Sequence, residues 1–267
     1  MNVIWEILRK INLPEKERRK EIKNILKNSN WQIYDDGYLL IYNNSDDKIN
    51  KVFLISCHID TVFDDKDFFV RKEEKKIIGT LDNSGSLAIL LKAMLENKLA
   101  NNVYVSFTTD EEGSCGGAHK TVRFLKDNAL LNRLSLVIVM DISANADFKC
   151  DVSLENYYLN KEELEKIENI LKKSKIKYYK IPVGEALPDE SGTYYQYKLK
   201  VFTLCLPVKV ECEENEECQT DLCYDGSLKE HCIKGAITTE RKMEKVKEAL
   251  VKIINGLSEN NWKEKDI

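Results

Sequence analysis

Four short apolar runs, separated by segments with helical spacing, most constrain the fold of this 267-residue chain. They are "VFLISC" at 52–57, "VYVSFTT" at 103–109, "LSLVIVMD" at 134–141 and "KVFTLCLP" at 200–207. Nearly continuous apolar runs of this length are typical of strands covered on both faces, as in a parallel sheet. Helical patterns lie between and after them. The alternation predicts an α/β chain with three layers, α/β/α, around a mostly parallel central sheet.

The remaining elements follow from local patterns. A hairpin is indicated at 31–43, where "DDG" separates two apolar segments, and a second one at 68–80. We expect helices at 5–11, 14–28, 84–97, 116–131, 161–174 and 238–257, and a further strand at 176–183. The chain has no internal repeat and no linker-like stretch, so we expect a single catalytic domain over 1–267 with an acidic, cysteine-rich surface loop at 209–229.

Composition excludes several classes of protein. The chain is 43% hydrophobic and 32% charged, which is typical of a globular protein and not of a disordered one. A net charge of −4 argues against a nucleic-acid partner. The sequence contains no apolar stretch of about 18 residues and no secretory signal pattern at its start, so we predict a cytoplasmic protein without a membrane partner. Its eight cysteines are then expected as thiols or metal ligands, because disulfides are rare in that compartment.

Polar side chains follow the predicted strands, at the edge where an open α/β sheet binds ligands. They are His58 and Asp60 after the first run, Asp82 before the helix at 84–97, Asp110, Glu111 and Glu112 after the second run, Asp141 after the third, and His231 in a late loop. Gathered carboxylates repel one another unless something positive lies between them. Two histidines and several carboxylates suit a pair of divalent metal ions, and zinc accepts nitrogen and oxygen ligands of this kind.

A two-metal site needs one carboxylate that bridges both ions. We assign Asp82 as the bridge, His58 and Asp141 to one ion, and Glu112 and His231 to the other. Glu111 then remains beside the site as a general base, and Asp60 orients the imidazole of His58. Each residue also has a plain structural interpretation: Asp82 as a helix cap, "DEEGS" as a solvated turn, Asp141 as a loop cap.

The motifs "CHIDTV", "GTLDNSGSLAILL", "TTDEEGS", "VMD" and the late "EHC" occur in the order found in the co-catalytic zinc exopeptidases, and the chain resembles that superfamily. The resemblance implies a zinc-exopeptidase (phosphorylase/hydrolase-like) fold and two Zn²⁺ per chain, with Co²⁺ or Mn²⁺ as alternatives. It implies that the metal ligands include His58, Asp82, Glu112 and Asp141. It also implies that Glu111 is the general base and that Asp60 is the aspartate that orients the histidine. His231 is the only histidine late enough for the last ligand. A cis peptide bond between Asp82 and Asn83 is also implied.

The chain departs from the family in carrying no insertion. Only 21 residues separate Asp60 from Asp82, so we expect a bare catalytic domain without a lid or dimerisation insertion, in which a homo-oligomer can restrict access to the site. The segment "LPDESGTYYQ" at 187–196 resembles one that precedes the last buried strand in the group. It offers Asp189, Glu190 and Tyr194 as substrate-binding residues.

The leading interpretation is an aminopeptidase acting on short peptides. Alternatives are a dipeptidase, a carboxypeptidase or a deacylase of N-acyl amino acids with the same metals, and a non-catalytic binding relative. Another is a redox or metal-sensing protein built on Cys212, Cys218, Cys223 and Cys232. The spacing of these four cysteines lacks the C-x2-C pairs of structural zinc sites, so unlinked thiols, a disulfide and a further metal site all stay open.

Overall fold

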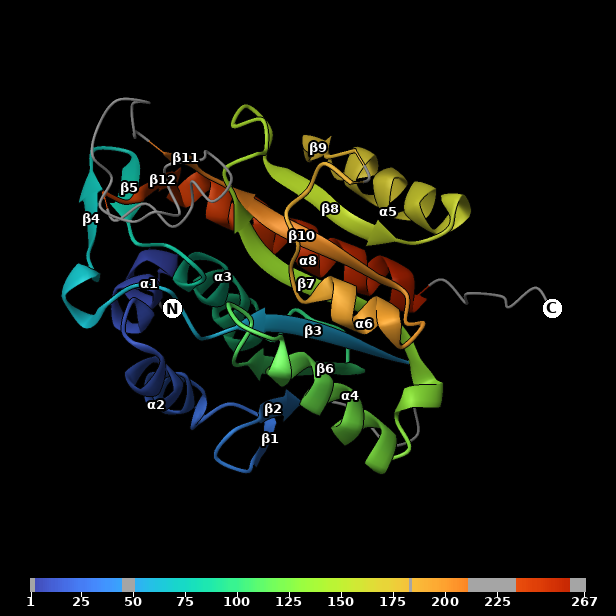
Figure 1. Ribbon diagram of the computed structural model, residues 1–267. Coiled ribbons are helices and arrows are strands. Elements are labelled where there is room, and N and C mark those ends of the chain that lie inside the picture. Colours follow the sequence, from blue (N-terminus) through green and yellow to red (C-terminus); the bar gives the residue numbers. More distant parts are fainter. Residues whose placement is uncertain (1–2, 45–50, 183, 211–233, 260–267) are drawn as a thin grey trace.

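The computed structural model describes residues 3–44, 51–182, 184–210 and 234–259. Its centre is an eight-stranded sheet in the order β1-β2-β6-β3-β7-β10-β8-β9 (Figure 1). The strands are β1 (Gln32–Asp35), β2 (Leu40–Asn43), β3 (Val52–His58), β6 (Val103–Thr108), β7 (Leu134–Ser143), β8 (Val152–Tyr158), β9 (Tyr178–Lys180) and β10 (Val201–Pro207). The predicted α/β class with a mostly parallel sheet is therefore confirmed.

Four adjacent central strands, β6, β3, β7 and β10, run parallel to one another. Their carboxyl ends therefore lie at one edge, which places the residues after each strand close together. On one side of these four strands, β2 of the antiparallel β1–β2 hairpin pairs with β6 in antiparallel orientation. On the other side, β8 pairs with β10, also in antiparallel orientation. Every residue of β3, β6 and β10 is buried, as their apolar sequences predict.

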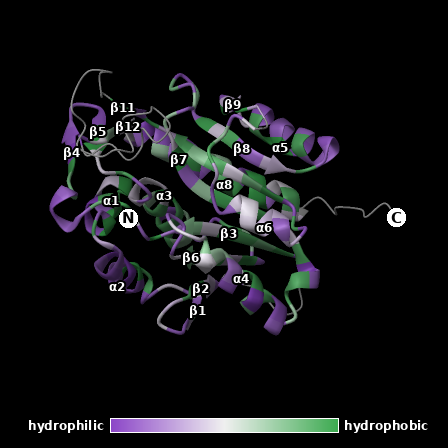
Figure 2. Ribbon diagram, in the orientation of Figure 1, coloured by the Kyte–Doolittle hydropathy of each residue, from purple (hydrophilic) through white to green (hydrophobic). Residues whose placement is uncertain are grey.

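Helices cover both faces of this sheet. α4 (Gly116–Asp127) and α6 (Ser191–Gln196) lie on one face, against β6 and β10 (Figure 1). α3 (Ser84–Leu95) and α8 (Glu240–Glu259) lie on the other, and α1 (Ile4–Ile11) and α5 (Lys161–Lys173) pack outside them. α2 (Glu15–Leu26) contacts α1 and α3. Figure 2 shows the expected segregation, with hydrophobic central strands and a largely hydrophilic α2.

A small second sheet lies beside the main one. Its order is β11-β12-β5-β4, from β4 (Val70–Glu73), β5 (Lys76–Gly79), β11 (Lys209–Val210) and β12 (Ala236–Thr239), all antiparallel. Single-turn 3₁₀ helices occur at η1 (Asp65–Asp67) and η2 (Leu131–Arg133). Within the described ranges, no helix is long and apolar enough to cross a membrane.

Most predicted elements form close to their expected bounds, and several short ones were missed. β8 and α6 had no counterpart in the sequence-based assignment, and β12 takes up the residues at which the closing helix was expected to begin. The Thr239 hydroxyl accepts a hydrogen bond from the Lys242 N–H at 3.2 Å, which caps the start of α8. The expected surface loop at 209–229 begins with strand residues 209–210, and the rest of it lies outside the described residues. The single-domain assignment and the cytoplasmic location stay predictions.

Candidate metal centre

His58 is the last residue of β3, and its imidazole lies between two carboxylates from other parts of the chain. Its Nε2 is 3.3 Å from Asp82 Oδ1 and 3.6 Å from Asp141 Oδ1. Asp82 precedes α3, and Asp141 lies near the end of β7, beside β3 in the sheet. The topology thus brings together three residues that are far apart in the sequence. The ligand atoms of this group all lie within 4.8 Å of one another.

Asp60 supports this arrangement from behind. Its Oδ1 lies 3.5 Å from His58 Nδ1, and its Oδ2 accepts a hydrogen bond from the Glu112 N–H at 3.1 Å. One carboxylate therefore fixes both the imidazole ring and the backbone of the neighbouring acidic turn. The peptide bond between Asp82 and Asn83 is cis, as the family resemblance implied.

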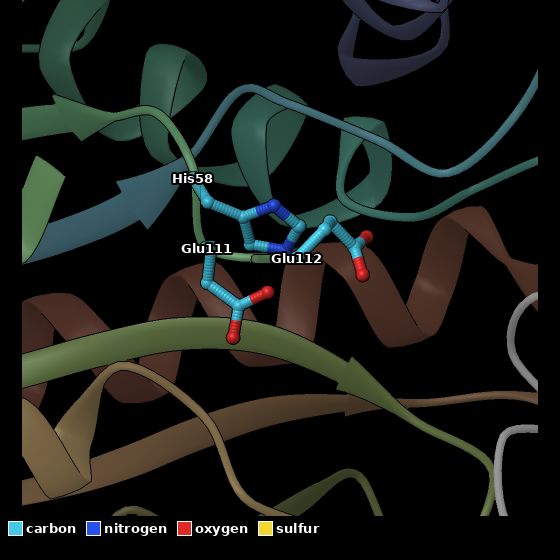
Figure 3. Close-up of side chains that lie close together, drawn as sticks. All are labelled: His58, Glu111 and Glu112. Atoms are coloured by element: carbon cyan, nitrogen blue, oxygen red, sulfur yellow. The ribbon is translucent and has the colours of Figure 1, made fainter. Parts of the chain in front are cut away.

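Glu111 and Glu112 are held by a tight turn between β6 and α4. Asp110 and Cys115 both have positive φ, at 61° and 54°, and the Asp110 carboxylate accepts hydrogen bonds from Ser114 Oγ and the Gly116 N–H. The turn directs both glutamates toward His58, and Figure 3 shows the two carboxylates beside its ring. With His58 they form a second group whose ligand atoms lie within 4.8 Å of one another.

The electrostatics reflect this crowding of acids around one imidazole. Burial alone would lower the pKa of His58, but the surrounding acids, Glu111 foremost, raise it well above its ordinary value. Burial raises the pKa of Glu111, and the Asp141, Glu190 and Glu112 carboxylates raise it further. Burial likewise raises the pKa of Asp141, against the opposing effect of His58. Buried carboxylates this close together repel one another when ionised, and a cation between them would relieve that repulsion.

These donors fit a divalent metal centre. Imidazole nitrogen and carboxylate oxygen are zinc ligands, and the site offers both within the reach of a single ion. The two overlapping groups share His58 and differ in their carboxylates, Asp82 and Asp141 in one and Glu111 and Glu112 in the other. How the ligands divide between two ions stays a prediction, as does the ligand role of His231, which lies outside the described residues.

The acids open into a cavity of about 190 Å³. Its wall includes His58, Asp82, Glu111, Glu112, Asp141, Ile142, Ser143, Asn145, Glu155, Leu187, Pro188, Asp189 and Cys205. Of the three residues predicted to bind substrate, Asp189 alone lies in this wall. Its Oδ1 accepts a hydrogen bond from the Ser191 N–H at 2.8 Å, and its other oxygen accepts one from Thr203 Oγ1 at 2.5 Å.

Glu190 and Tyr194 lie under the cavity rather than in its wall. Glu190 is buried, and its Oε2 accepts a hydrogen bond from Thr108 Oγ1 at 2.8 Å. Burial raises the pKa of Glu190 to about 7. Tyr194 is also fully buried, with its hydroxyl 2.7 Å from Ser56 Oγ. The predicted role of both side chains in substrate binding stays a prediction.

A larger hollow of about 530 Å³ lies elsewhere, between the β4–β5 hairpin and the start of α8. Lysines and an arginine dominate its wall, and none of the predicted site residues reaches it. The chemistry therefore belongs to the smaller cavity at the strand ends.

Sequence reasoning missed Arg18, which lies fully buried behind the centre. Its Nη1 donates to the backbone oxygens of Ile59 at 3.1 Å and Asp60 at 3.3 Å, and its Nε donates to Leu13 O at 3.0 Å. Burial lowers its pKa to about 10, against the opposing effect of Asp82 and other acids, so the guanidinium is charged at neutral pH. A signal was present, because Arg18 shares the buried face of α2 with Ile22 and Leu26 at helical spacing.

Glu155, on β8, was missed as well. The segment "VSLENYY" alternates, with Val152 and Leu154 in the apolar core and Ser153 and Glu155 on the opposite face. Recognising this period of two would have predicted both the strand and a buried carboxylate on it.

The model of peptidase family M28 matches residues 39–194, which include every described candidate of the centre. No curated protein sequence matches the chain.

Solved structures share the fold at low sequence identity. An aminopeptidase from the archaeon Desulfurococcus kamchatkensis has a TM-score of 0.72 at 11% identity, over 94% of this chain and 94% of that one. The TET1 peptidase of Pyrococcus horikoshii has a TM-score of 0.64 at 14% identity, over 94% and 99% of the two chains. A protein described as an endoglucanase from Thermotoga maritima has a TM-score of 0.65 at 12% identity, over 97% and 98%.

These likenesses concern the fold. The family match covers more than half of the chain and includes four of the five motifs noted in the sequence, all but the late "EHC". The resemblance to the co-catalytic zinc exopeptidases is confirmed: the chain belongs to peptidase family M28 and is a metal-dependent peptidase.

Proposed function

We propose that this peptidase is an aminopeptidase that uses two zinc ions to remove residues from the free amino end of short peptides. The observation that carries the proposal is the convergence of His58, Asp82, Glu111, Glu112 and Asp141 on one small cavity at the carboxyl ends of the parallel strands. A structural role alone would not require so many acids to share one edge of the sheet at the electrostatic cost described above.

His58, Asp82, Glu112 and Asp141 would hold the metal, with His231 as the predicted further ligand. When bound, two divalent ions supply Lewis acidity and lower the pKa of a bound water toward about 7. The protein's own task is then to position groups and move protons. Asp60 keeps the imidazole of His58 in place through the 3.5 Å contact with its Nδ1.

Glu111 is the proton carrier in this proposal. Its carboxylate lies beside His58 and forms part of the cavity wall. It accepts a proton from the attacking water and returns it to the nitrogen of the leaving amine. A carboxylate can make both transfers, because it accepts a proton when ionised and donates it once protonated.

The charge of the cavity favours an amino end over a carboxyl end. Among the described residues, its wall contains no lysine and no arginine. A carboxypeptidase or a dipeptidase must bind the carboxylate of its substrate, which normally requires a cation such as arginine. Asp189 and Glu155 instead add negative charge beyond the proposed ligands and base. A substrate ammonium group suits such a wall.

A matched peptide set tests the proposal. One short peptide is prepared with a free amino end, with an acetylated amino end, and with an amidated carboxyl end, and product release is followed after zinc reconstitution and after chelation. We expect cleavage of the free-amine forms, with or without the carboxylate, and none of the acetylated form. Cleavage of the acetylated peptide or of an N-acyl amino acid would favour the deacylase alternative instead.

We also propose that the protein forms a homo-oligomer. The TET1 peptidase of similar fold is described as assembling into a tetrahedron or a large octahedral shell. Light scattering after size-exclusion chromatography checks this, and a monomeric mass at micromolar concentration would contradict it.

A further inference from the structure

Glu155 is a buried carboxylate in the wall of the cavity that the proposed reaction does not use. It lies in the fourth position of β8, with 5% of its surface exposed. Ser153 Oγ donates a hydrogen bond to its Oε1 at 2.6 Å. The side chains of Ser143 and Cys205 also hydrogen-bond to this carboxylate, and such contacts offset the cost of burying it in the cavity wall.

The register of the sheet fixes which way Glu155 faces. Asp141 on β7 pairs with Cys205 on β10, and Cys205 pairs with Ser153 on β8. Side chains of paired residues share a face, and residues two apart on a strand do too, so Glu155 faces the same side as Asp141. Asp141 and Glu155 are two strands apart, so their backbones lie about 10 Å or more from each other.

A bulge lies directly after Glu155 on β8. The β8–β10 register shifts between Val201 and Thr203, and Asn156, directly after Glu155, has a φ of 42°. Bulges of this kind re-aim side chains and are common beside active sites. Asn156 Nδ2 also donates to the backbone oxygen of Leu187 at 2.7 Å, which fastens the loop before α6 beside Glu155.

Part of the cavity wall is apolar. Ile142, Leu187 and Pro188 line the same cavity as the acids. The cavity, at about 190 Å³, is smaller than the roughly 300–1,000 Å³ of pockets for drug-sized ligands and suits one amino-acid side chain. A cavity whose wall has both apolar side chains and a carboxylate beyond the proposed metal ligands and base matches a lysine, which has a four-carbon stem and a compact charged head.

We propose that Glu155 is a specificity-determining residue that pairs with the cationic side chain of the first substrate residue, so that the enzyme prefers peptides beginning with lysine or arginine. The inference rests on the proposed aminopeptidase activity and names its substrate class. Asp189 adds negative charge to the same wall, and its two oxygens accept hydrogen bonds from Ser191 and Thr203.

The test compares lysyl and norleucyl anilides, which share the four-carbon stem and differ in the terminal ammonium. We expect the zinc-loaded wild-type enzyme to favour the lysyl anilide in kcat/KM. Glu155→Gln, which keeps the shape of the side chain, should lower the lysyl-to-norleucyl ratio about tenfold. Glu155→Asp should retain part of the preference, and Glu155→Lys should shift it toward a glutamyl anilide.

Glu165→Gln is the matched control, because Glu165 is an exposed acid on α5 far from the cavity wall. It should leave both rates unchanged. Equal wild-type rates on the two anilides, or a Glu155→Gln variant whose ratio is unchanged, would overturn the role of Glu155 and leave the aminopeptidase proposal standing. No hydrolysis of any free-amine substrate by the zinc-loaded wild-type enzyme would overturn both.

Discussion

Glu111 and Glu112 show how much a single position can matter in this centre. They are adjacent, chemically identical, and both directed toward His58. The backbone N–H of Glu112 is fixed by Asp60, and we assign its carboxylate to the metal. We assign Glu111 to proton transfer. The two roles predict different consequences for the same substitution.

Glu111→Gln should reduce kcat by about 10²–10⁴-fold, because the amide cannot carry the proton. Its zinc content, measured by atomic absorption after desalting, should stay close to that of the wild type. Glu112→Gln is the matched comparison and should lose zinc. Near-normal turnover by Glu111→Gln would rule out its role as the base, and loss of zinc from it alone would exchange the two roles.

The residues at the strand ends could be predicted from sequence because each directly follows or precedes an apolar run or helix. His58, Asp82, Glu111, Glu112 and Asp141 are all of this kind. Arg18 and Glu155 could not be found this way, because their importance depends on packing between distant elements. Both are charged residues at positions that the hydrophobic pattern assigns to the core. Such a charge in a sequence is usually taken to mean that the predicted register of the helix or strand is wrong.

At the level of elements, the turn between β6 and α4 is the most constrained part of the site. The Gly117 N–H donates to Thr109 O at 2.9 Å, which folds the start of α4 back onto the end of β6. A Cβ on Gly117 would lie 2.5 Å from the backbone nitrogen and oxygen of Thr109. Neither backbone atom can move without shifting the turn that carries Glu111 and Glu112.

Gly117→Ala should therefore destabilise the fold by about 1–3 kcal/mol, as overpacking in a tight contact does. Urea unfolding followed by circular dichroism measures this change. Gly192→Ala, at a helical position of α6 where a Cβ would meet nothing within 4 Å, is the control and should be neutral or slightly stabilising. Equal stability of Gly117→Ala and wild type would show that the turn can relax.

Elements with a strong hydrophobic pattern in their own sequence were predicted. Elements that depend on tertiary contacts were not. β3, β6, β7 and β10 are apolar runs, and α3 and α8 have long helical patterns. α6 is a six-residue helix with three tyrosine or threonine positions of low helix propensity, and it is held by burial of Ser191 and Tyr194. β12 is four residues long and depends on pairing with β5 and β11.

At the scale of the whole molecule, an ion-pair cluster joins α3 to α8 behind the sheet. Glu96, after α3, lies 3.1 Å from Lys92, 2.9 Å from Lys98 and 3.0 Å from Lys247 of α8. Burial tends to raise the pKa of Glu96, but the hydrogen bonds from the three lysines outweigh it and lower the pKa to about 2.

A carboxylate whose pKa is lower in the folded state stabilises the fold above its ordinary pKa of 4.5 and loses this contribution as pH falls toward about 2. The wild type should therefore exceed Glu96→Gln in free energy of unfolding by roughly 1–3 kcal/mol near neutral pH. The difference should shrink as the pH falls below about 5. Urea titrations at a series of pH values measure it.

Glu6→Gln removes an exposed pair with Arg9 at 3.8 Å and should change stability little at any pH. A difference between wild type and Glu96→Gln that does not vary with pH would contradict the assigned pKa.

The arginine behind the centre ties the amino-terminal helices to the chemistry. Arg18 reaches from α2 to the two backbone oxygens that follow His58, so α2 can leave its place only by releasing the segment that carries His58 and Asp60. Thermodynamic linkage is reciprocal. If the docking of α2 raises the metal affinity of the centre by some factor, metal binding raises the equilibrium constant for docking of α2 by the same factor. The protection of α2 from solvent exchange would thus report whether the ions of the centre are in place.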